Sequence, residues 1–195
     1  MRIGILGGTF DPPHAGHWLA AVDAFESMGL DRLLFIPAAT QPLKAGASVA
    51  PAADRLAMVR LMAQGDARFA VDAIEIERAG LSFTVDTLRS LHVREPQVEW
   101  VLCIGTDAWA HFAQWREPDE VRRLATIALL PRNGAGPDAA SAVPGPGTIV
   151  IPMRRVDVSS TEIRARVRAG RSVRGFVTEP VAAYIAAHGL YRQGN

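Results

Sequence analysis

The sequence contains a single cysteine, Cys103, among its 195 residues. An internal disulfide is therefore excluded, and a metal cluster held by cysteine side chains is not expected. No uncharged apolar stretch approaches the roughly 20 residues that a membrane-spanning helix needs, and the apolar run Ile3–Leu6 is too short for a signal peptide. These absences predict a cytoplasmic protein in a reducing compartment that does not bind a membrane.

The chain also lacks an excess of either charge. Lysine and arginine number 21 and aspartate and glutamate 20, which gives a formal net charge of +1. This balance argues against a broad basic face for nucleic acid, and no stripe of aromatic and basic residues supports one. It leaves room for a small pocket that binds one anionic ligand. The length predicts one domain, 1–195, with a helical C-terminal part from about residue 152.

Short, continuous apolar runs mark the expected strands. They are Arg2–Leu6, Arg32–Ile36, Val98–Ile104, Thr126–Leu130 and, as a last strand, Thr148–Ile151. Runs of this kind are typical of strands covered on both faces. Apolar residues at helical spacing predict helices over Ala15–Met28, Asp54–Ala63, Thr84–His92, Ser159–Ala169 and Glu179–His188. This alternation predicts an α/β fold, a Rossmann-like open parallel sheet flanked by helices.

Within the second expected helix, Leu56, Val59 and Met62 form the apolar face. Arg55 and Arg60 are expected on its flanks. Cys103, Trp18 and Trp100 are expected to pack without a chemical role.

The segment GGTFDPPHAGH, residues 7–17, follows the first expected strand and opens the first expected helix. Ligands of open parallel sheets bind at the carboxyl ends of the strands. Gly7 and Gly8 leave backbone amides open to a ligand that approaches closely. His14 and His17 share one face if their turn is helical, at a helix N-terminus where the dipole favours an anion. A tight turn with both histidines in solvent is the simpler alternative.

Other phosphate-binding and metal-binding patterns are missing. The chain has neither the G-x-x-x-x-G-K-[ST] pattern of a P-loop nor a G-x-G-x-x-G fingerprint after its first strand. A zinc site on the two histidines would need a third ligand, and Asp11 is the one nearby candidate. We therefore predict no metal held by a set of protein ligands.

The segment VSSTEIR near the C-terminus is a second candidate site. Ser159 and Glu162 have the S-x-x-E spacing of a capping box, in which each side chain bonds the other residue's backbone amide. The same turn offers the hydroxyls of Ser160 and Thr161, and Arg164 lies one turn further on. Hydroxyls, free amides and a guanidinium at a helix N-terminus form an anion site. We expect both roles, with capping alone as the simpler alternative.

The two segments together carry a family resemblance. The first resembles the T/HxGH signature of the nucleotidylyltransferase superfamily, distantly related to class I aminoacyl-tRNA synthetases. The second resembles its ISSTxIR signature, with Val158 in place of Ile. The resemblance implies that His14, His17 and Arg164 stabilise charge on the reacting phosphates of ATP. It also implies an ATP-binding set of Gly7, Gly8, Thr9, Phe10, Ser159, Ser160 and Thr161.

The segments between the motifs are similar to those of bacterial nicotinate-nucleotide adenylyltransferases, over nearly the whole chain. The similar segments are IPAATQPLK (36–44), SFTVDTL (82–88), IGTD (104–107) with Trp115 downstream, and EPVAAYIAAHGLYR (179–192). The chain also departs from the family. Gln41 and Leu43 replace a proline and a histidine, and Phe83 replaces a tyrosine. Arg116 stands where the family often has a second aromatic residue.

This resemblance implies adenylyl transfer from ATP to nicotinate mononucleotide in NAD biosynthesis, with deamido-NAD (nicotinate adenine dinucleotide) and pyrophosphate as products. Trp115 offers a face on which a pyridine ring can stack. Thr84 opens an expected helix whose amides can hold the nicotinate carboxylate. The resemblance also implies Phe83, which keeps an aromatic ring, as a nicotinate mononucleotide-binding residue. The remaining implied ATP-binding residues are Lys44, Gly105, Asp107 and Arg132. Mg²⁺ is the implied cofactor, held mainly by the ATP phosphates and water.

Three alternatives remain open from the sequence. The acceptor could be nicotinamide mononucleotide or phosphopantetheine instead of nicotinate mononucleotide. The chain could be a nucleotide-binding module without catalytic activity, although the two histidines and Arg164 argue against it. A nucleic-acid-binding protein has little support from the charge. The oligomeric state is also open, a homo-oligomer included.

Overall fold

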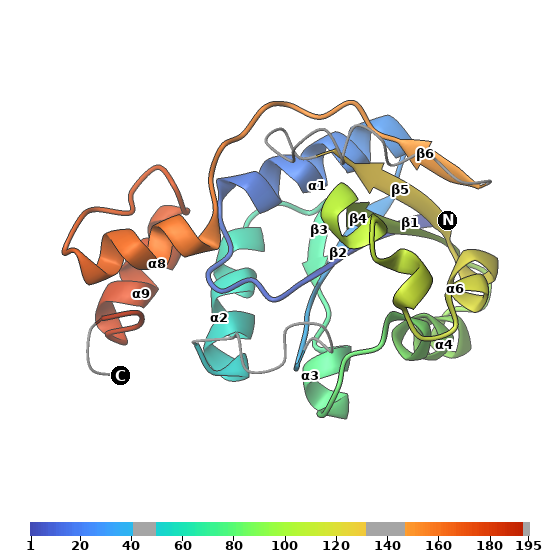
Figure 1. The fold of residues 1–195 in the computed structure, drawn as a ribbon, viewed down its shortest axis with the longest axis horizontal. Coiled ribbons are helices and arrows are strands. Elements are labelled where there is room, and N and C mark those ends of the chain that lie inside the picture. The colour runs from blue at the N-terminus through green and yellow to red at the C-terminus, as the bar shows by residue number, and fades with distance from the viewer. Residues whose placement is uncertain (41–49, 132–146, 193–195) are drawn as a thin grey trace.

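The computed structural model describes residues 1–40, 50–131 and 147–192 (Figure 1). Six strands form one sheet in the order β3-β2-β1-β4-β5-β6, and every neighbouring pair is parallel. The strands are β1 (Arg2–Gly8), β2 (Arg32–Pro37), β3 (Phe69–Val71), β4 (Glu99–Gly105), β5 (Thr126–Leu130) and β6 (Thr148–Val150). The predicted fold, an open parallel sheet flanked by helices, is confirmed.

The strand order reverses beside β1. The chain builds outward from β1 through β2 to β3, and then returns to place β4 on the other side of β1. Leu6 of β1 lies opposite Cys103 of β4, so both strands end at the same edge of the sheet. The connections that leave β1 and β4 diverge there and open the crevice in which sheets of this kind bind ligands.

The helices cover both faces of the sheet. They are α1 (Ala15–Met28), α2 (Ala52–Ala63), α3 (Ile74–Arg78), α4 (Thr84–Arg94), α5 (Thr106–Trp109), the 3-10 helix η2 (Phe112–Gln114), α6 (Pro118–Leu124), α8 (Ser160–Arg168) and α9 (Glu179–Ala187). In Figure 1 the C-terminal helices α8 and α9, orange to red, lie at one end of the molecule, where α9 contacts α2. None of the described helices is long and apolar enough to cross a membrane.

Two apolar cores lie on opposite faces of the sheet. Alternate residues of β4 divide between them: Val101 and Cys103 join the core shared by α1, α2, α8 and α9, whereas Leu102 and Ile104 join the core shared by α4 and α6. Each central strand therefore buries both of its faces, which explains its continuous apolar sequence. Trp100 is buried and Trp18 packs against the first core, as predicted.

Two details of the prediction were wrong. The three-residue edge strand β3 was missed, together with the short helices α3, η2 and α6. Arg55, expected on a flank of α2, is only 1% exposed and lies on the buried face of that helix with Met58, Val59 and Met62.

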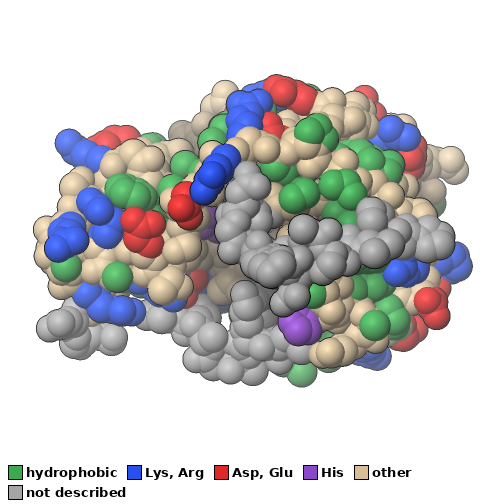
Figure 2. Space-filling model, turned by 45° about the horizontal axis from the view of Figure 1, so that its top comes forward, with side chains coloured by type: hydrophobic (Ala, Val, Ile, Leu, Met, Phe, Trp, Pro, Cys, Tyr) green, Lys and Arg blue, Asp and Glu red, His purple; other side chains and the backbone are tan. Residues whose placement is uncertain are grey.

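The face seen in Figure 2 shows how charge is distributed over part of the surface. Positively and negatively charged side chains are interspersed on it, and no single basic patch dominates the view. This arrangement agrees with the near-zero net charge of the chain.

The burial of Cys103 leads to a first prediction. Burial raises the pKa of the Cys103 thiol to about 12, and the thiolate is the form that reacts with disulfide reagents. At pH 8, below this pKa, the folded protein should not react with Ellman's reagent, whereas the same protein in guanidinium should release one equivalent of thiolate. Reaction of the folded protein at the rate of an exposed thiol would contradict the described packing of β4.

Candidate active site

The turn after β1 places two histidine rings at the N-terminus of α1. His14 is the N-cap residue with an extended backbone, and its Nδ1 accepts a hydrogen bond from the amide of Gly16 at 3.1 Å. His17 Nδ1 accepts a hydrogen bond from the amide of His14 at 3.2 Å. The two side chains thus form a reciprocal capping box, which satisfies amides that the start of a helix leaves without partners.

This capping fixes which ring nitrogen can donate. Because Nδ1 accepts a backbone proton in both rings, the neutral imidazoles of His14 and His17 carry their own protons on Nε2. The ring centroids are 3.8 Å apart. The pair therefore brings two N–H donors to the positive end of a helix dipole, an arrangement that suits an anion.

The aromatic ring of Phe10 packs against the histidine pair and supports it. Phe10 is buried and has a φ of +52°, a left-handed conformation that is unusual outside glycine. Its ring meets the His17 ring edge-on with the centroids 4.9 Å apart. A Cβ at Gly8 would come within 3.2 Å of the Phe10 ring, so a side chain there would press on that ring. Gly7 is different, because a side chain there would find only ordinary contact distance and the residue is exposed.

The second motif contacts the first directly. Ser160 Oγ donates to the carbonyl of Pro12 at 2.8 Å, across 148 residues of sequence. Arg164 Nη1 donates to the carbonyl of Asp11 at 2.8 Å, and its Nη2 donates to Thr161 Oγ1 at 3.3 Å. The N-terminal end of α8 and the histidine turn therefore form one site.

Ser159 caps α8 as predicted, but the predicted capping box forms only in part. Ser159 Oγ accepts from the amide of Glu162 at 3.1 Å. The reciprocal bond, from the amide of Ser159 back to Glu162, does not form between these two described residues. Glu162 is exposed instead, because solvation of its carboxylate competes with folding back onto the helix end.

At the end of β4, Gly105 is the N-cap residue of α5 and Asp107 lies exposed in its first turn. Since β4 lies beside β1, both residues follow the strand edge that carries Gly7 and Gly8. Lys44 and Arg132, also predicted to bind ATP, lie outside the described residues.

The residues predicted to bind nicotinate mononucleotide lie around α4. Phe83 is the N-cap position of α4 and Thr84 is its first residue; the side chain of Phe83 makes no capping hydrogen bond. Trp115 packs against Phe112 with ring centroids 5.2 Å apart, and both Phe83 and Trp115 pack against the second core. Phe83 and Trp115 therefore line the same part of the molecule.

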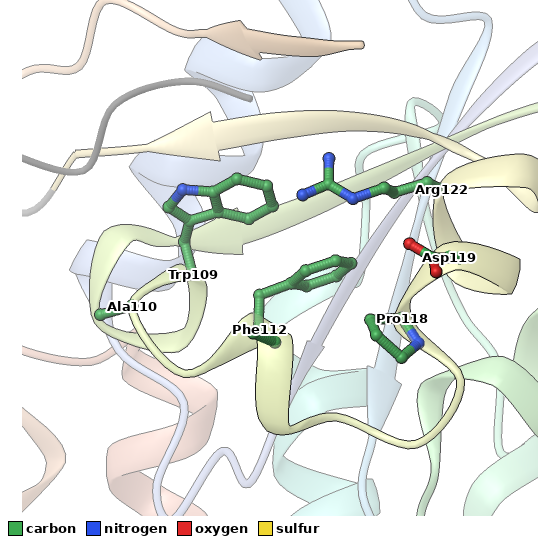
Figure 3. Close-up of a pocket in the computed structure, with 7 residues that line it drawn as sticks. Trp109, Ala110, Phe112, Pro118, Asp119 and Arg122 are labelled. Carbon is green, nitrogen blue, oxygen red and sulfur yellow. The ribbon is translucent and has the colours of Figure 1, made fainter. Parts of the chain in front are cut away.

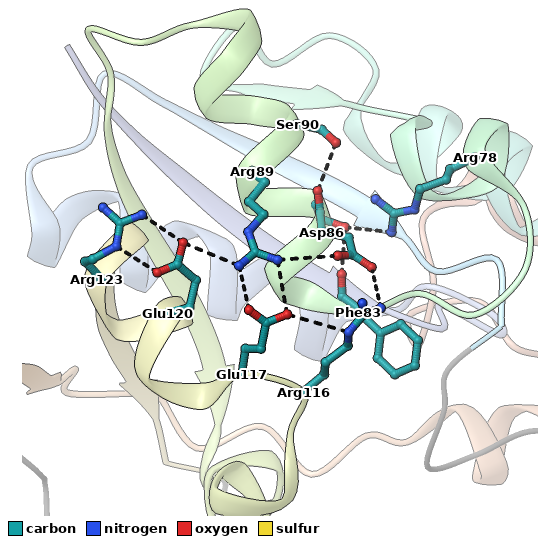
Figure 4. Close-up of polar contacts among 10 residues, drawn as sticks. Arg78, Phe83, Asp86, Arg89, Ser90, Arg116, Glu117, Glu120 and Arg123 are labelled. Atoms are coloured by element: carbon teal, nitrogen blue, oxygen red, sulfur yellow. Dashed lines mark hydrogen bonds and ion pairs between the residues drawn. The ribbon is translucent and has the colours of Figure 1, made fainter.

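Charged side chains join the segment that bears Trp115 to α4 (Figure 4). The guanidinium of Arg116 lies 5.0 Å from the centroid of the Phe83 ring and donates to Asp86 at 3.1 Å. Arg89 of α4 donates to both oxygens of Glu117, at 3.1 and 2.6 Å. Arg116, where the family often has an aromatic residue, thus covers the face of the Phe83 ring.

A separate hollow adjoins this segment (Figure 3). The pocket has a volume of about 320 Å³ and is lined by Trp109, Ala110, Phe112, Ala113, Pro118, Asp119 and Arg122. The guanidinium of Arg122 lies 4.9 Å from the ring centroids of both Trp109 and Phe112. None of the predicted site residues lines this pocket.

Arg55 is a part of the site that the sequence analysis missed. Its guanidinium donates to the carbonyls of Thr9 and Ala38 at 2.8 and 2.7 Å and to that of Ala39 at 3.0 Å, and its Nε donates to the carbonyl of Ala50 at 3.2 Å. Burial lowers the pKa of this guanidinium, and the charge of Asp11 opposes the shift. Arg55 thereby ties together the backbone that follows β1, the backbone that follows β2 and the start of α2.

The comparisons with known proteins agree with this geometry. A family model described as cytidylyltransferase-like matches residues 5–166, so the fold and site define a nucleotidyltransferase of that class. The chain is 48% identical to a probable nicotinate-nucleotide adenylyltransferase of Gemmatimonas aurantiaca, with 99% of this chain and 93% of that protein covered. It is 44% identical to the corresponding Thermus thermophilus protein over 98% of this chain and all of that protein. The chain belongs to the nicotinate-nucleotide adenylyltransferase family, which confirms the family expected from the sequence.

Solved structures agree with the fold. The "Plasmodium falciparum nicotinic acid mononucleotide adenylyltransferase complexed with NaAD" superimposes with a TM-score of 0.77 at 16% identity, covering 97% of both chains. "The Crystal Structure of a Putative Nicotinate-nucleotide Adenylyltransferase from Vibrio parahaemolyticus" gives a TM-score of 0.71 at 20% identity, covering 98% of this chain and 96% of that chain.

The close approach at Gly16 gives a second prediction. A Cβ at Gly16 would lie 3.0 Å from two atoms of the His14 ring, so Gly16→Ala should displace the imidazole and break its capping bond. We expect a loss of about 10²-fold in turnover, the scale of a small misplacement in an active site. The melting temperature should change little, because the gain of about 1 kcal/mol from alanine over glycine in a helix offsets the similar cost of the lost cap. Steady-state kinetics and thermal unfolding together check this, and full activity would contradict the packing of His14.

Proposed function

We propose that the site at the end of β1 transfers the adenylyl group of ATP to nicotinate mononucleotide, with deamido-NAD and pyrophosphate as products. The observation that carries this proposal is the contact of α8 with the turn that precedes α1. Arg164 and Ser160 bond the carbonyls of Asp11 and Pro12, just before the histidines at the start of α1. Relatives named nicotinate-nucleotide adenylyltransferase, matched over nearly their full length, support the choice of acceptor.

The chemistry requires positioning and charge stabilisation. The 5′-phosphate of nicotinate mononucleotide is already an anion at neutral pH, so it attacks the α-phosphorus without a general base. A bond forms from this phosphate oxygen to the α-phosphorus, and the bond from the α-phosphorus to the bridging oxygen breaks to release pyrophosphate. The Nε2–H donors of His14 and His17 and the guanidinium of Arg164 stabilise the charge that develops on these oxygens.

The proposed ATP-binding residues contribute different groups to the nucleotide. Gly7 and Thr9 offer backbone at the end of β1, and Ser160 and Thr161 offer the first-turn amides of α8 beside the Ser159 cap. Phe10 contributes indirectly, because its ring packs edge-on against the His17 ring and holds it in position. Gly8, Gly105 and Asp107 follow the same sheet edge, where the Asp107 carboxylate can accept hydrogen bonds from ribose hydroxyls. Lys44 and Arg132 stay predictions.

The nicotinate part of the acceptor binds at α4. Trp115 offers a ring for stacking, and the amides at Thr84 offer donors for the carboxylate that nicotinate has and nicotinamide lacks. Phe83 contributes a second aromatic ring to this part of the site, and the guanidinium of Arg116 lies over that ring.

Mg²⁺ would be held mainly by the phosphates of ATP and by water. Within the described residues, no group of three or more His, Cys, Asp and Glu side chains is placed to hold a metal ion. The exposed carboxylate of Asp107 is an oxygen ligand of the type that Mg²⁺ prefers. The ion would add positive charge on the triphosphate. A cytoplasmic location belongs to the same proposal, supported by the single, buried cysteine.

Replacement of His17 tests the proposal. His17→Ala removes one preorganised donor, so we expect turnover to fall by roughly 10²–10³. Pyrophosphate release from Mg-ATP and nicotinate mononucleotide is the measurement. His92→Ala is the control, because His92 lies in the last turn of α4, where its Nδ1 hydrogen-bonds the carbonyl of Leu88 and its ring lies near Trp100, at the opposite end of the helix from Thr84. A His17→Ala enzyme as active as the control would refute the phosphate role of His17.

A further inference from the structure

A buried hydrogen bond joins the end of the described chain to the histidine turn. Tyr191 is 4% exposed, and its hydroxyl donates to Asp11 Oδ1 at 2.7 Å across 180 residues of sequence. The backbone amide of Ala50 donates to the same carboxylate oxygen at 3.2 Å. Asp11 itself is 4% exposed. A carboxylate this deeply buried needs such donors, since loss of one leaves part of its desolvation uncompensated.

Asp11 lies in the turn between β1 and α1 that carries the contacts of the site. Its carbonyl accepts from Arg164, and the carbonyl of the next residue, Pro12, accepts from Ser160. Two residues further along, His14 is the N-cap residue of α1. Any shift of Asp11 therefore reaches both the guanidinium and the imidazole that are assigned to the phosphates.

The packing around Tyr191 also fixes its position. Its φ of +65° is a left-handed conformation that disfavours residues with a side chain, and such a conformation persists only where the surrounding structure enforces it. Leu190 beside it is buried in the same core as Ile163 of α8 and Val181 of α9. Burial and the Asp11 charge both raise the pKa of the Tyr191 phenol, so the hydroxyl keeps its proton and remains a donor.

We propose that Tyr191 is a positioning residue, which fixes the histidine turn by holding the carboxylate of Asp11. It acts through Asp11 and does not touch the reacting atoms. Arg55 holds the same turn from the other side, through the carbonyl of Thr9. The C-terminal segment thereby contributes to catalysis as well as to packing. This inference rests on the proposed roles of His14 and Arg164.

The chain offers a matched control, because it has two tyrosines and both donate to an aspartate from the C-terminal part. Tyr184 of α9 donates to Asp54 Oδ1 of α2 at 2.8 Å. This bond also ties the C-terminal part to the rest of the molecule, but it makes no contact with the turn. Tyr184→Phe thus reports the effect of losing a structural bond alone.

Tyr191→Phe removes only the hydroxyl and preserves the buried ring. We expect kcat to fall by about tenfold, the scale of one lost hydrogen bond to a charged group, while the KM values for ATP and nicotinate mononucleotide stay within about twofold. Tyr184→Phe should retain the kcat of the unmodified enzyme. Thermal unfolding of both variants verifies that each is folded at the assay temperature. A kcat for Tyr191→Phe equal to that of Tyr184→Phe would overturn the proposal.

A second readout does not depend on turnover. In protein labelled with ¹⁵N-histidine, the ring nitrogens report which nitrogen carries the proton. Tyr191→Phe should shift the His14 Nδ1 signal, and Tyr184→Phe should leave it in place. Unchanged His14 signals in Tyr191→Phe would also overturn the positioning role. An unmodified enzyme that releases no pyrophosphate would instead refute the proposed function, so the two failures can be told apart.

Discussion

The start of α1 needs hydrogen-bond acceptors, and the chain supplies them with imidazole rings. His14 and His17 each use Nδ1 to accept a backbone proton, at 3.1 and 3.2 Å. The same bonds leave Nε2 as the donating nitrogen of each ring. Capping of the helix and presentation of donors to an anion are therefore a single arrangement. Gly16 allows the close approach of the His14 ring, and Phe10 supports that of His17.

The rest of the molecule brings distant segments to this turn. The strand order reverses beside β1, and because β1 and β4 are parallel neighbours, their ends lie at one edge of the sheet. Arg164 and Ser160 reach the carbonyls of the turn from α8, and Arg55 reaches it from α2. Most of these contacts are hydrogen bonds to backbone carbonyls, which hold geometry at modest net energy. Such a scaffold suits a reaction whose rate depends on positioning and charge stabilisation.

Local sequence patterns predicted most of the fold and part of the site. The bounds of α1, Ala15–Met28, were predicted to the residue, because Leu19, Val22 and Phe25 recur at three-residue steps and Gly29 ends the helix in a left-handed conformation. Strand β3 was missed because three residues carry too little pattern. Arg55 was misplaced because its charge suggested a flank, although it stands at i, i+3, i+4 and i+7 spacing with Met58, Val59 and Met62. The Tyr191–Asp11 bond spans 180 residues, so no local pattern indicates it.

Pyrophosphate release from Mg-ATP, measured in parallel with nicotinate mononucleotide and with nicotinamide mononucleotide, tests the account most directly. The two acceptors differ only in the charged carboxylate that the amides at Thr84 are proposed to bind. We predict strong release with the acid and little with the amide. Equal release would remove the proposed carboxylate site, and release with neither acceptor would contradict the assigned reaction.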